Sequence, residues 1–148
     1  MAITGEYVPS PSQWVRDQVG TIEATGTTDS VDIMGLPVVM LTMRGAKSGA
    51  VRKVPLMRVE HDGSFAAVAS QGGAPAHPQW YHNLLAHPDI ELQAGTDTFP
   101  VHARELAGEE REQWWERCVA AFPSYAEYQT KTDRLIPVFV LERRDTGR

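Results

Sequence analysis

Short alternations of apolar and polar residues, separated by turn signals, fill the middle of the chain. Leu36–Met43 is an apolar run of the kind expected for a buried strand, and Val51–Glu60 and Phe65–Ser70 have the pattern of two further strands. The intervening segments are rich in glycine and polar residues, so we expect the three strands to form an antiparallel meander. Pro55 lacks a backbone N–H, which predicts an edge position or a bulge for the second strand.

A second hairpin is predicted further along the chain. Residues 90–94 and 99–103 alternate apolar and polar positions on either side of the turn Gly95-Thr96-Asp97, which is typical of a hairpin with one buried face. The apolar segment Ile136–Leu141 predicts a final strand.

Four segments have helical spacing or helix signals. Ser10-Pro11-Ser12-Gln13 has the pattern of a helix start with Ser10 as the cap, and apolar residues follow at helical spacing to Ile22. Helices are also predicted over 78–86, ending before Pro88, and over 109–122, with a shorter one over 125–131.

Together these patterns give about six strands and three or four helices without regular strand–helix alternation. They exclude a doubly wound parallel sheet and favour the α+β class, as an antiparallel barrel or half-barrel with peripheral helices. We expect a single domain, with a helix and loop over 1–35, a barrel with inserted helices over 36–142, and a tail over 143–148.

Composition and charge indicate the cellular compartment of this domain and the partners that it can bind. Cys118 is the single cysteine, so no intrachain disulfide can form, and its apolar helical neighbours predict a packed side chain. The 148 residues contain no apolar run of membrane-span length, and the first ten lack the pattern of a signal peptide, so we expect a cytoplasmic protein. A net charge of −5 argues against nonspecific binding to nucleic acid.

One stretch has the opposite charge. Between Ile33 and Val59 there is no Asp or Glu, and the cations there are Arg44, Lys47, Arg52, Lys53 and Arg58. The stretch is followed by Ser70-Gln71-Gly72-Gly73, where backbone N–H groups could join the cations around an anion. The pattern predicts a site for a phosphate-bearing cofactor.

Other chemistries find little support in the sequence. The phosphate-loop and dinucleotide-binding glycine motifs are absent, and there is no nucleophile-elbow pattern. His77, His82 and His87 are spaced by five residues, which prevents them from sharing one helical face, so no metal site is expected. Ser70 is either an ordinary turn residue or a hydroxyl that donates a hydrogen bond to a bound molecule. Tyr125 and Tyr128 are by default half-buried packing residues. The residues alone therefore predict an anion-binding antiparallel barrel and no particular reaction.

Several motifs, in this order and spacing, resemble the deazaflavin-dependent nitroreductase family, actinobacterial proteins that use coenzyme F420. The resemblance covers nearly everything from Leu36 to Leu141. Its motifs are VVMLTMRGAKSG, the following Arg52 and Pro55-Leu56, VASQGG, HPQWYHNLLAHPDI and FPSYAEYQTKTDRLIPVFVL.

The resemblance implies a split β-barrel related to FMN-binding barrels, with the deazaflavin ring in a groove and its anionic tail over basic residues. Lys47 and Arg52 would contact the tail and phosphate, beside the backbone of Ser48-Gly49. The ring pocket would be lined by Pro55, Met57, Ala69, Ser70, Gln79 and Trp80, with Gln71 and Gly72 in the adjoining loop. Ala46 and Gln71 stand where the family commonly has Arg and Lys, so we expect a changed tail affinity or tail-length preference.

The implied activity is hydride transfer from reduced F420 to a small acceptor such as a quinone, an activated enone or a nitroaromatic. Ser70 and Tyr125 would stabilise the developing oxyanion, Tyr125 would also deliver a proton, and Tyr128 would close over the substrate. Two alternatives stay open, an F420 carrier or store without turnover and a barrel that binds FMN or haem. The N-terminal helix also leaves open a peripheral membrane contact for a lipophilic quinone.

Overall fold

The computed structural model describes residue 3 and residues 5–144. Within them the elements follow in this order: α1 (Gln13–Thr25), the 3-10 turn η1 (Thr28–Ser30), β1 (Val38–Arg44), β2 (Val51–Met57), β3 (Glu60–His61), β4 (Ser64–Val68), the 3-10 turn η2 (Gln71–Gly73), α2 (Gln79–Ala86), β5 (Asp89–Ala94), β6 (Asp97–Glu105), α3 (Gly108–Ala121), α4 (Ser124–Thr130) and β7 (Val138–Arg143). The last four residues of the predicted tail, 145–148, lie outside the described residues.

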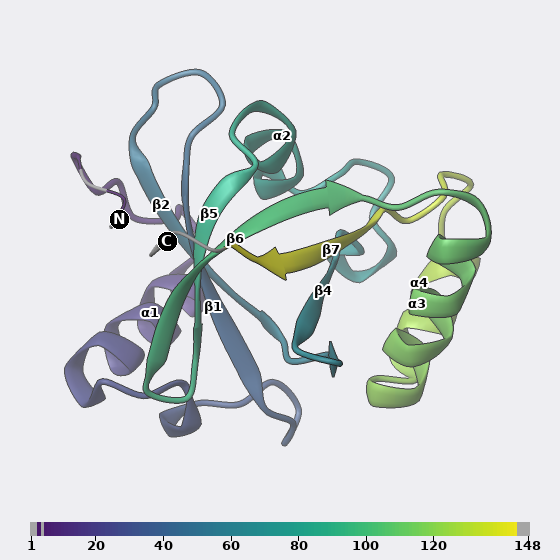
Figure 1. Ribbon diagram of the computed structural model, residues 1–148, viewed down its shortest axis with the longest axis horizontal. Helices are drawn as coiled ribbons and strands as arrows, with labels where there is room; N and C mark the ends of the chain where they lie inside the picture. Colours follow the sequence, from purple (N-terminus) through teal and green to yellow (C-terminus); the bar gives the residue numbers. More distant parts are fainter. Residues whose placement is uncertain (1–2, 4, 145–148) are drawn as a thin grey trace.

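All seven strands belong to one sheet, in the order β2-β1-β5-β6-β7-β4-β3, and every neighbouring pair is antiparallel. The sheet curls into a half-barrel, with α1 beyond one end and α3 and α4 beyond the other (Figure 1). The predicted α+β class and the antiparallel half-barrel with peripheral helices are confirmed, as is the hairpin formed by β5 and β6.

The predicted meander is correct at both of its turns but wrong in its second strand. The predicted strand over 51–60 divides into β2, which pairs with β1 along its whole length, and β3, which forms a hairpin with β4 at the far end of the sheet order, where β4 also pairs with β7. The reason is burial: Phe65–Val68 are all buried, so β4 needs an apolar strand beside it, and Val138–Leu141 of β7 provides one. β2 stays at the edge, as Pro55 predicts.

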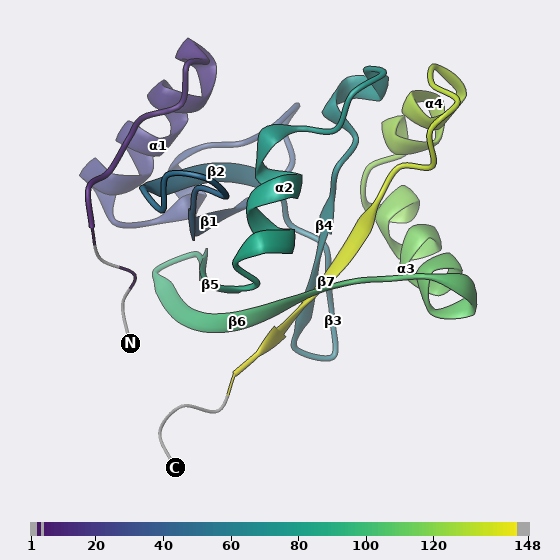
Figure 2. The ribbon, with the colours of Figure 1, turned by 90° about the horizontal axis from the view of Figure 1, so that it is seen from above.

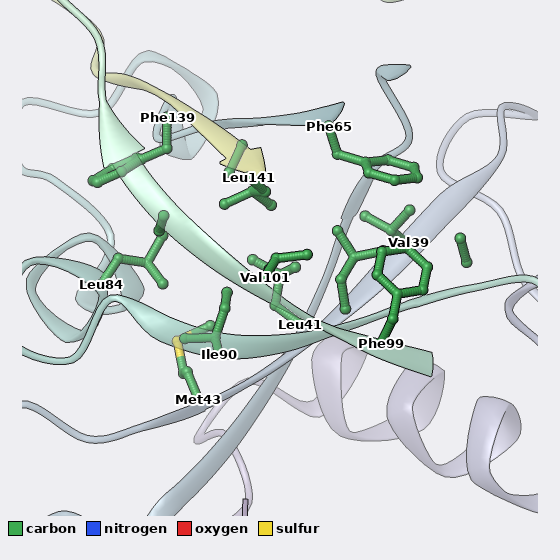
Figure 3. Packing of buried hydrophobic residues seen from close by; sticks show 14 residues of the cluster. Val39, Leu41, Met43, Phe65, Leu84, Ile90, Phe99, Val101, Phe139 and Leu141 are labelled. Carbon is green, nitrogen blue, oxygen red and sulfur yellow. The ribbon is translucent and has the colours of Figure 1, made fainter. Parts of the chain in front are cut away.

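The larger core cluster fills the concave side of the sheet, under α2. Alternate residues of β1, β5, β6 and β7 point into it, and Leu84 of α2 covers them (Figure 3). The labelled members are Val39, Leu41, Met43, Phe65, Leu84, Ile90, Phe99, Val101, Phe139 and Leu141. Each such side chain contributes about 1.5–3 kcal/mol when fully buried, so this cluster holds α2 against the sheet through Leu84.

A second cluster lies on the opposite face of β4 and β7, where α3 packs. Val138 and Val140 alternate with the two β7 residues of the first cluster and contact this helix side. Cys118 is fully buried there, and burial raises the pKa of its thiol to about 12, so the side chain packs as a small apolar group and stays protonated. The prediction of a packed cysteine is confirmed.

α1 covers the other end of the sheet through Val19 and Ile22, which pack on Met40. The helix begins at Gln13, and its cap is Ser12, whose Oγ accepts from the N–H of Val15 at 3.5 Å. The prediction of Ser10 as the cap is wrong because Ser10 Oγ accepts instead from the N–H of Ser12, one residue before the helix. Within the described residues, no helix has the length and apolar character needed to cross a membrane.

Candidate functional site

A cavity of about 690 Å³ opens along the edge of the sheet formed by β2. Its walls come from β2, the start of α1, the segment from β4 to η2, the start of α2, and α4. Figure 2 shows that the first turn of α1, η2 and α4 lie on the same side of the molecule, above the sheet. The volume falls within the range of 300–1,000 Å³ that is usual for small-molecule sites.

One wall of the cavity is apolar. It is formed by Val54–Met57 of β2 and by Met43 and Trp80, and the Trp80 ring is supported from below by Phe139, with ring centroids 6.3 Å apart. A flat apolar surface of this kind suits a planar aromatic molecule, whose faces gain from contact with apolar side chains.

Ser70 stands on the opposite wall, where the buried strand β4 ends and η2 begins. It is 8% exposed, lines the cavity, and its hydroxyl makes no capping bond to η2. Gln71 follows with φ at +46°, a left-handed conformation that is costly for a residue with a side chain. Gln71 also lines the cavity, so the strained position lies in the wall itself.

The strained loop is held from behind by Arg134. Its guanidinium donates to the carbonyls of Ala69 at 3.1 Å, Ser70 at 2.7 Å and Ala74 at 2.9 Å. Its Nη1 also lies 2.9 Å from Nδ1 of His77. Because arginine can only donate, His77 must be neutral there with its proton on Nε2. The pKa of His77 is lowered, first by burial and then by Arg134, in agreement with this tautomer.

Two tyrosines of α4 complete the cavity. Tyr125 is 5% exposed and packs edge-to-face on Phe122, with ring centroids 4.9 Å apart, and the ring of Tyr128 lies 6.3 Å from that of Tyr125. Burial raises the pKa of Tyr125 far above its usual value, so its hydroxyl stays protonated and is available as a hydrogen-bond donor.

The basic stretch divides between the cavity and the turn outside it. Arg52 and Lys53 line the cavity, and Lys53 also pairs with Glu23 of α1. Lys47 and Ser48 are exposed on the turn between β1 and β2, which projects from one end of the sheet beside α2 (Figure 1). Asn83 of α2 holds this turn by accepting from the N–H of Ala46 at 2.9 Å.

Most of the predicted site residues meet in this one cavity. Nine of them line it: Arg52, Pro55, Met57, Ser70, Gln71, Gln79, Trp80, Tyr125 and Tyr128. Lys47, Ser48 and Gly49 belong to the exposed turn beyond it, Ala69 is fully buried behind the wall, and Gly72 lies within η2. The structure thus separates the predicted tail contacts on the turn from the predicted ring contacts, while Arg52 stands on the cavity side.

Sequence reasoning missed several residues of this region. Arg134, buried Asn83 and Phe122 received no role, and Trp14 and Met34 at the cavity mouth were not connected with the site. Asn83 could have been found from the sequence, because a polar residue among the apolar residues of a helix predicts a specific hydrogen-bond partner. No local pattern indicates that Arg134 contacts residues about sixty positions earlier.

In the part of the chain that the structure describes, no group of three or more His, Cys, Asp and Glu side chains is arranged to hold a metal ion.

Comparison with known proteins places the chain in one protein family. The model of the F420H(2)-dependent quinone reductase family matches residues 14–143. An F420H(2)-dependent quinone reductase of Mycobacterium tuberculosis (strain H37Rv) is 36% identical over 111 residues, which cover 73% of this chain and 74% of that protein.

Solved structures extend the comparison to the fold. An F420-H2 dependent reductase is 57% identical, with a TM-score of 0.69 over 76% of this chain and 99% of that one. A chain described as a domain-swapped dimer is also 57% identical, with a TM-score of 0.71 over 90% of this chain and 100% of that one. HutZ, a haem storage protein of Vibrio cholerae, is 12% identical with a TM-score of 0.53 over 74% of this chain and 82% of that one, a likeness of fold alone.

Proposed function

Because this chain belongs to the F420H(2)-dependent quinone reductase family, we propose that it reduces a quinone in the cavity between β2, η2 and α4, with reduced F420 as the hydride donor. Activated enones and nitroaromatics are further acceptors in this proposal. The observation that carries it is the meeting, in one cavity of about 690 Å³, of an apolar wall, a basic end at Arg52, and the hydroxyl side chains of Ser70, Tyr125 and Tyr128.

The residues present fit a deazaflavin. The wall around Pro55, Met57 and Trp80 suits the faces of a planar ring, and Gln79 and Ser70 can bond its polar edge. Arg52 lines the cavity, and the exposed Lys47 stands on the turn beyond β2, so an anionic tail leaving the ring would meet positive charge. When bound, reduced F420 supplies a hydride, and with one further proton this converts a quinone to a quinol.

In this proposal Ser70 and Tyr125 donate hydrogen bonds to the acceptor oxygen, on which negative charge develops as the hydride arrives. The elevated pKa of Tyr125 supports hydrogen-bond donation better than net release of its proton. The proposal therefore departs from the expectation that Tyr125 also delivers the proton, and takes the final proton from water on the side of half-buried Tyr128.

The mouth of the cavity supports a lipophilic acceptor. Trp14 is 51% exposed and Met34 is 72% exposed, yet both line the cavity. Met34 also has φ at +54°, in a two-residue turn closed by mutual backbone bonds between Ile33 and Leu36. A large apolar residue held outward in a left-handed conformation suggests a contact with a hydrocarbon substituent, such as the side chain of a quinone. Peripheral membrane contact would follow if that substituent stays in a bilayer.

We also infer that the protein works in a reducing, cytoplasmic setting, because its single cysteine allows no intrachain disulfide of the kind that proteins of oxidising compartments use.

The direct test combines purified protein with reduced F420 and menadione under anaerobic conditions. Recovery of the visible absorbance of oxidised F420, with equimolar quinol formed, is the expected result. If F420 binds tightly but its reduced form is not oxidised by any quinone, enone or nitroaromatic, the protein is a carrier of F420 and not a reductase. Preferential binding of FMN or haem would contradict the cofactor assignment.

A further inference from the structure

Arg134 does not line the cavity, but three of its nitrogens reach the loop that does. Nε donates to the carbonyl of Ala74, Nη1 to that of Ala69, and Nη2 to that of Ser70, at 2.7 to 3.1 Å. These carbonyls flank η2 on both sides, so one rigid side chain holds both ends of the segment that carries Ser70 and Gln71. A guanidinium has five N–H donors in a fixed plane, which a lysine ammonium cannot reproduce.

The segment around Arg134 is also attached to α4, the helix that carries Tyr125 and Tyr128. Gln129 of α4 donates through Nε2 to the Arg134 carbonyl at 2.8 Å, and its Oε1 accepts from the N–H of Ile136 at 3.0 Å. Gly73 of η2 lies against α4 so closely that a Cβ there would stand 2.7 Å from the carbonyl oxygen of Tyr128. The loop with Ser70 and the helix with Tyr125 therefore share one support.

His77 completes the arrangement. Its Nδ1 accepts from Arg134 at 2.9 Å, and its ring stacks on Tyr81 with centroids 4.3 Å apart. A neutral ring in this tautomer keeps the guanidinium turned toward the loop carbonyls.

We infer that Arg134 is a positioning residue, which sets the distance and angle between the Ser70 hydroxyl and the tyrosines of α4 on the two sides of the acceptor. The inference rests on the proposed function. Its chemical consequence is large because a misplacement of about 1 Å in a reacting geometry can lower a rate by about 100-fold. Arg134 does not line the cavity, so its removal should affect the hydride step more than cofactor affinity.

The test compares Arg134→Lys and Arg134→Gln with Arg104→Lys. Arg104 pairs with Glu110 and Glu142 away from the cavity and so controls for the loss of a surface guanidinium. For both Arg134 variants we expect the single-turnover rate of F420H2 oxidation by menadione to fall at least about tenfold, with an F420 dissociation constant within about threefold of wild type. Addition of millimolar guanidinium to the Gln variant should restore part of the rate. The Arg104 variant should match wild type.

A rate that is unchanged in correctly folded Arg134 variants, or a loss of stability without a loss of rate, would overturn the inference. Amide hydrogen exchange separates this failure from that of the proposed function, since it needs no cofactor. The arrangement predicts faster exchange in Arg134→Lys over both 69–74 and 124–130, and exchange that stays at wild-type levels in both would also overturn it. Absence of F420 binding by the wild type would instead refute the proposed function.

Discussion

The two loops beside the cavity are supported differently. The turn between β1 and β2 is exposed at Lys47 and Ser48 and is closed by its own backbone bonds, from the N–H of Gly45 to the carbonyl of Ala50 and from the N–H of Gly49 to the carbonyl of Gly45, and Asn83 of α2 accepts from the N–H of Ala46. The loop from Ala69 to Ala74 is fixed by three bonds from Arg134 and by the contact of Gly73 with α4. A charged tail can be gripped by mobile cations through water, whereas a hydride must travel along one geometry. The difference suggests that the exposed turn contributes affinity and the fixed loop contributes rate.

The largest effect is expected at the fixed side. Ser70→Ala and Tyr125→Phe each remove one donor to the developing oxyanion, and loss of such a donor typically lowers kcat by about 100-fold or more. Stopped-flow oxidation of bound F420H2 by menadione measures this loss. Ser64→Ala, the same kind of change at the other end of β4 and outside the cavity lining, is the control and should leave the rate intact. If both donor variants keep the wild-type rate, these hydroxyls have no role in the chemistry.

A smaller effect is expected at the exposed turn. Lys47→Ala should raise the F420 dissociation constant by at most about fivefold, because an exposed ion pair contributes about 0.2–1 kcal/mol. Arg52→Ala should raise it further, since Arg52 is half-buried at the cavity. Fluorescence titration at low and high salt checks both, and the difference from wild type should shrink as salt screens the charges. An unchanged affinity in the double variant would remove the tail assignment.

The cavity mouth should discriminate between acceptors by a few-fold. Met34→Gly relieves the left-handed backbone but removes the apolar contact, so we expect a higher KM for a quinone with a long hydrocarbon substituent and an unchanged KM for menadione. Steady-state kinetics with the two quinones measures the ratio. Leu85→Ala, at an exposed leucine of α2 that does not line the cavity, is the control. Equal effects on both quinones would contradict the contact.

The smallest expected effect is on pH dependence. The pKa of His77 is lowered from 6.5 by burial, then by Arg134 and His82, whereas Glu105 acts in the opposite direction. Below pH 6.5 the unfolded chain therefore takes up the proton before the folded one, and the free energy of unfolding should decrease as the pH falls. His77→Asn keeps an acceptor near Nδ1 and cannot titrate, so it should flatten this part of the curve in chemical denaturation. A wild-type curve that is already flat there would contradict the neutral tautomer.

Much of this architecture could be predicted from local patterns. The hairpins, the edge position of Pro55, the packed Cys118 and the resemblance to proteins that use F420 are confirmed, because turn residues, alternation and motif order depend on short segments. The pairing of β4 with β7 was missed because it joins segments about seventy residues apart, and alternation specifies a strand but not its neighbour.

The same limit applies to the site. Ser70, Tyr125 and Trp80 were predicted from motifs, and the structure brings them to one cavity, although their roles stay predictions. Arg134 was missed because its partners are backbone carbonyls, which leave no mark on the sequence of the loop they belong to.

The division of labour between the two loops is tested most directly by one experiment, the single-turnover rate of F420H2 oxidation by menadione at saturating cofactor in the Lys47→Ala/Arg52→Ala double variant. We expect a rate within about twofold of wild type once higher cofactor concentrations have compensated for the weaker binding, because the geometry around Ser70 and Tyr125 is untouched. A rate lowered as far as that of Ser70→Ala would show that the basic residues take part in the hydride step, and would contradict this division of labour.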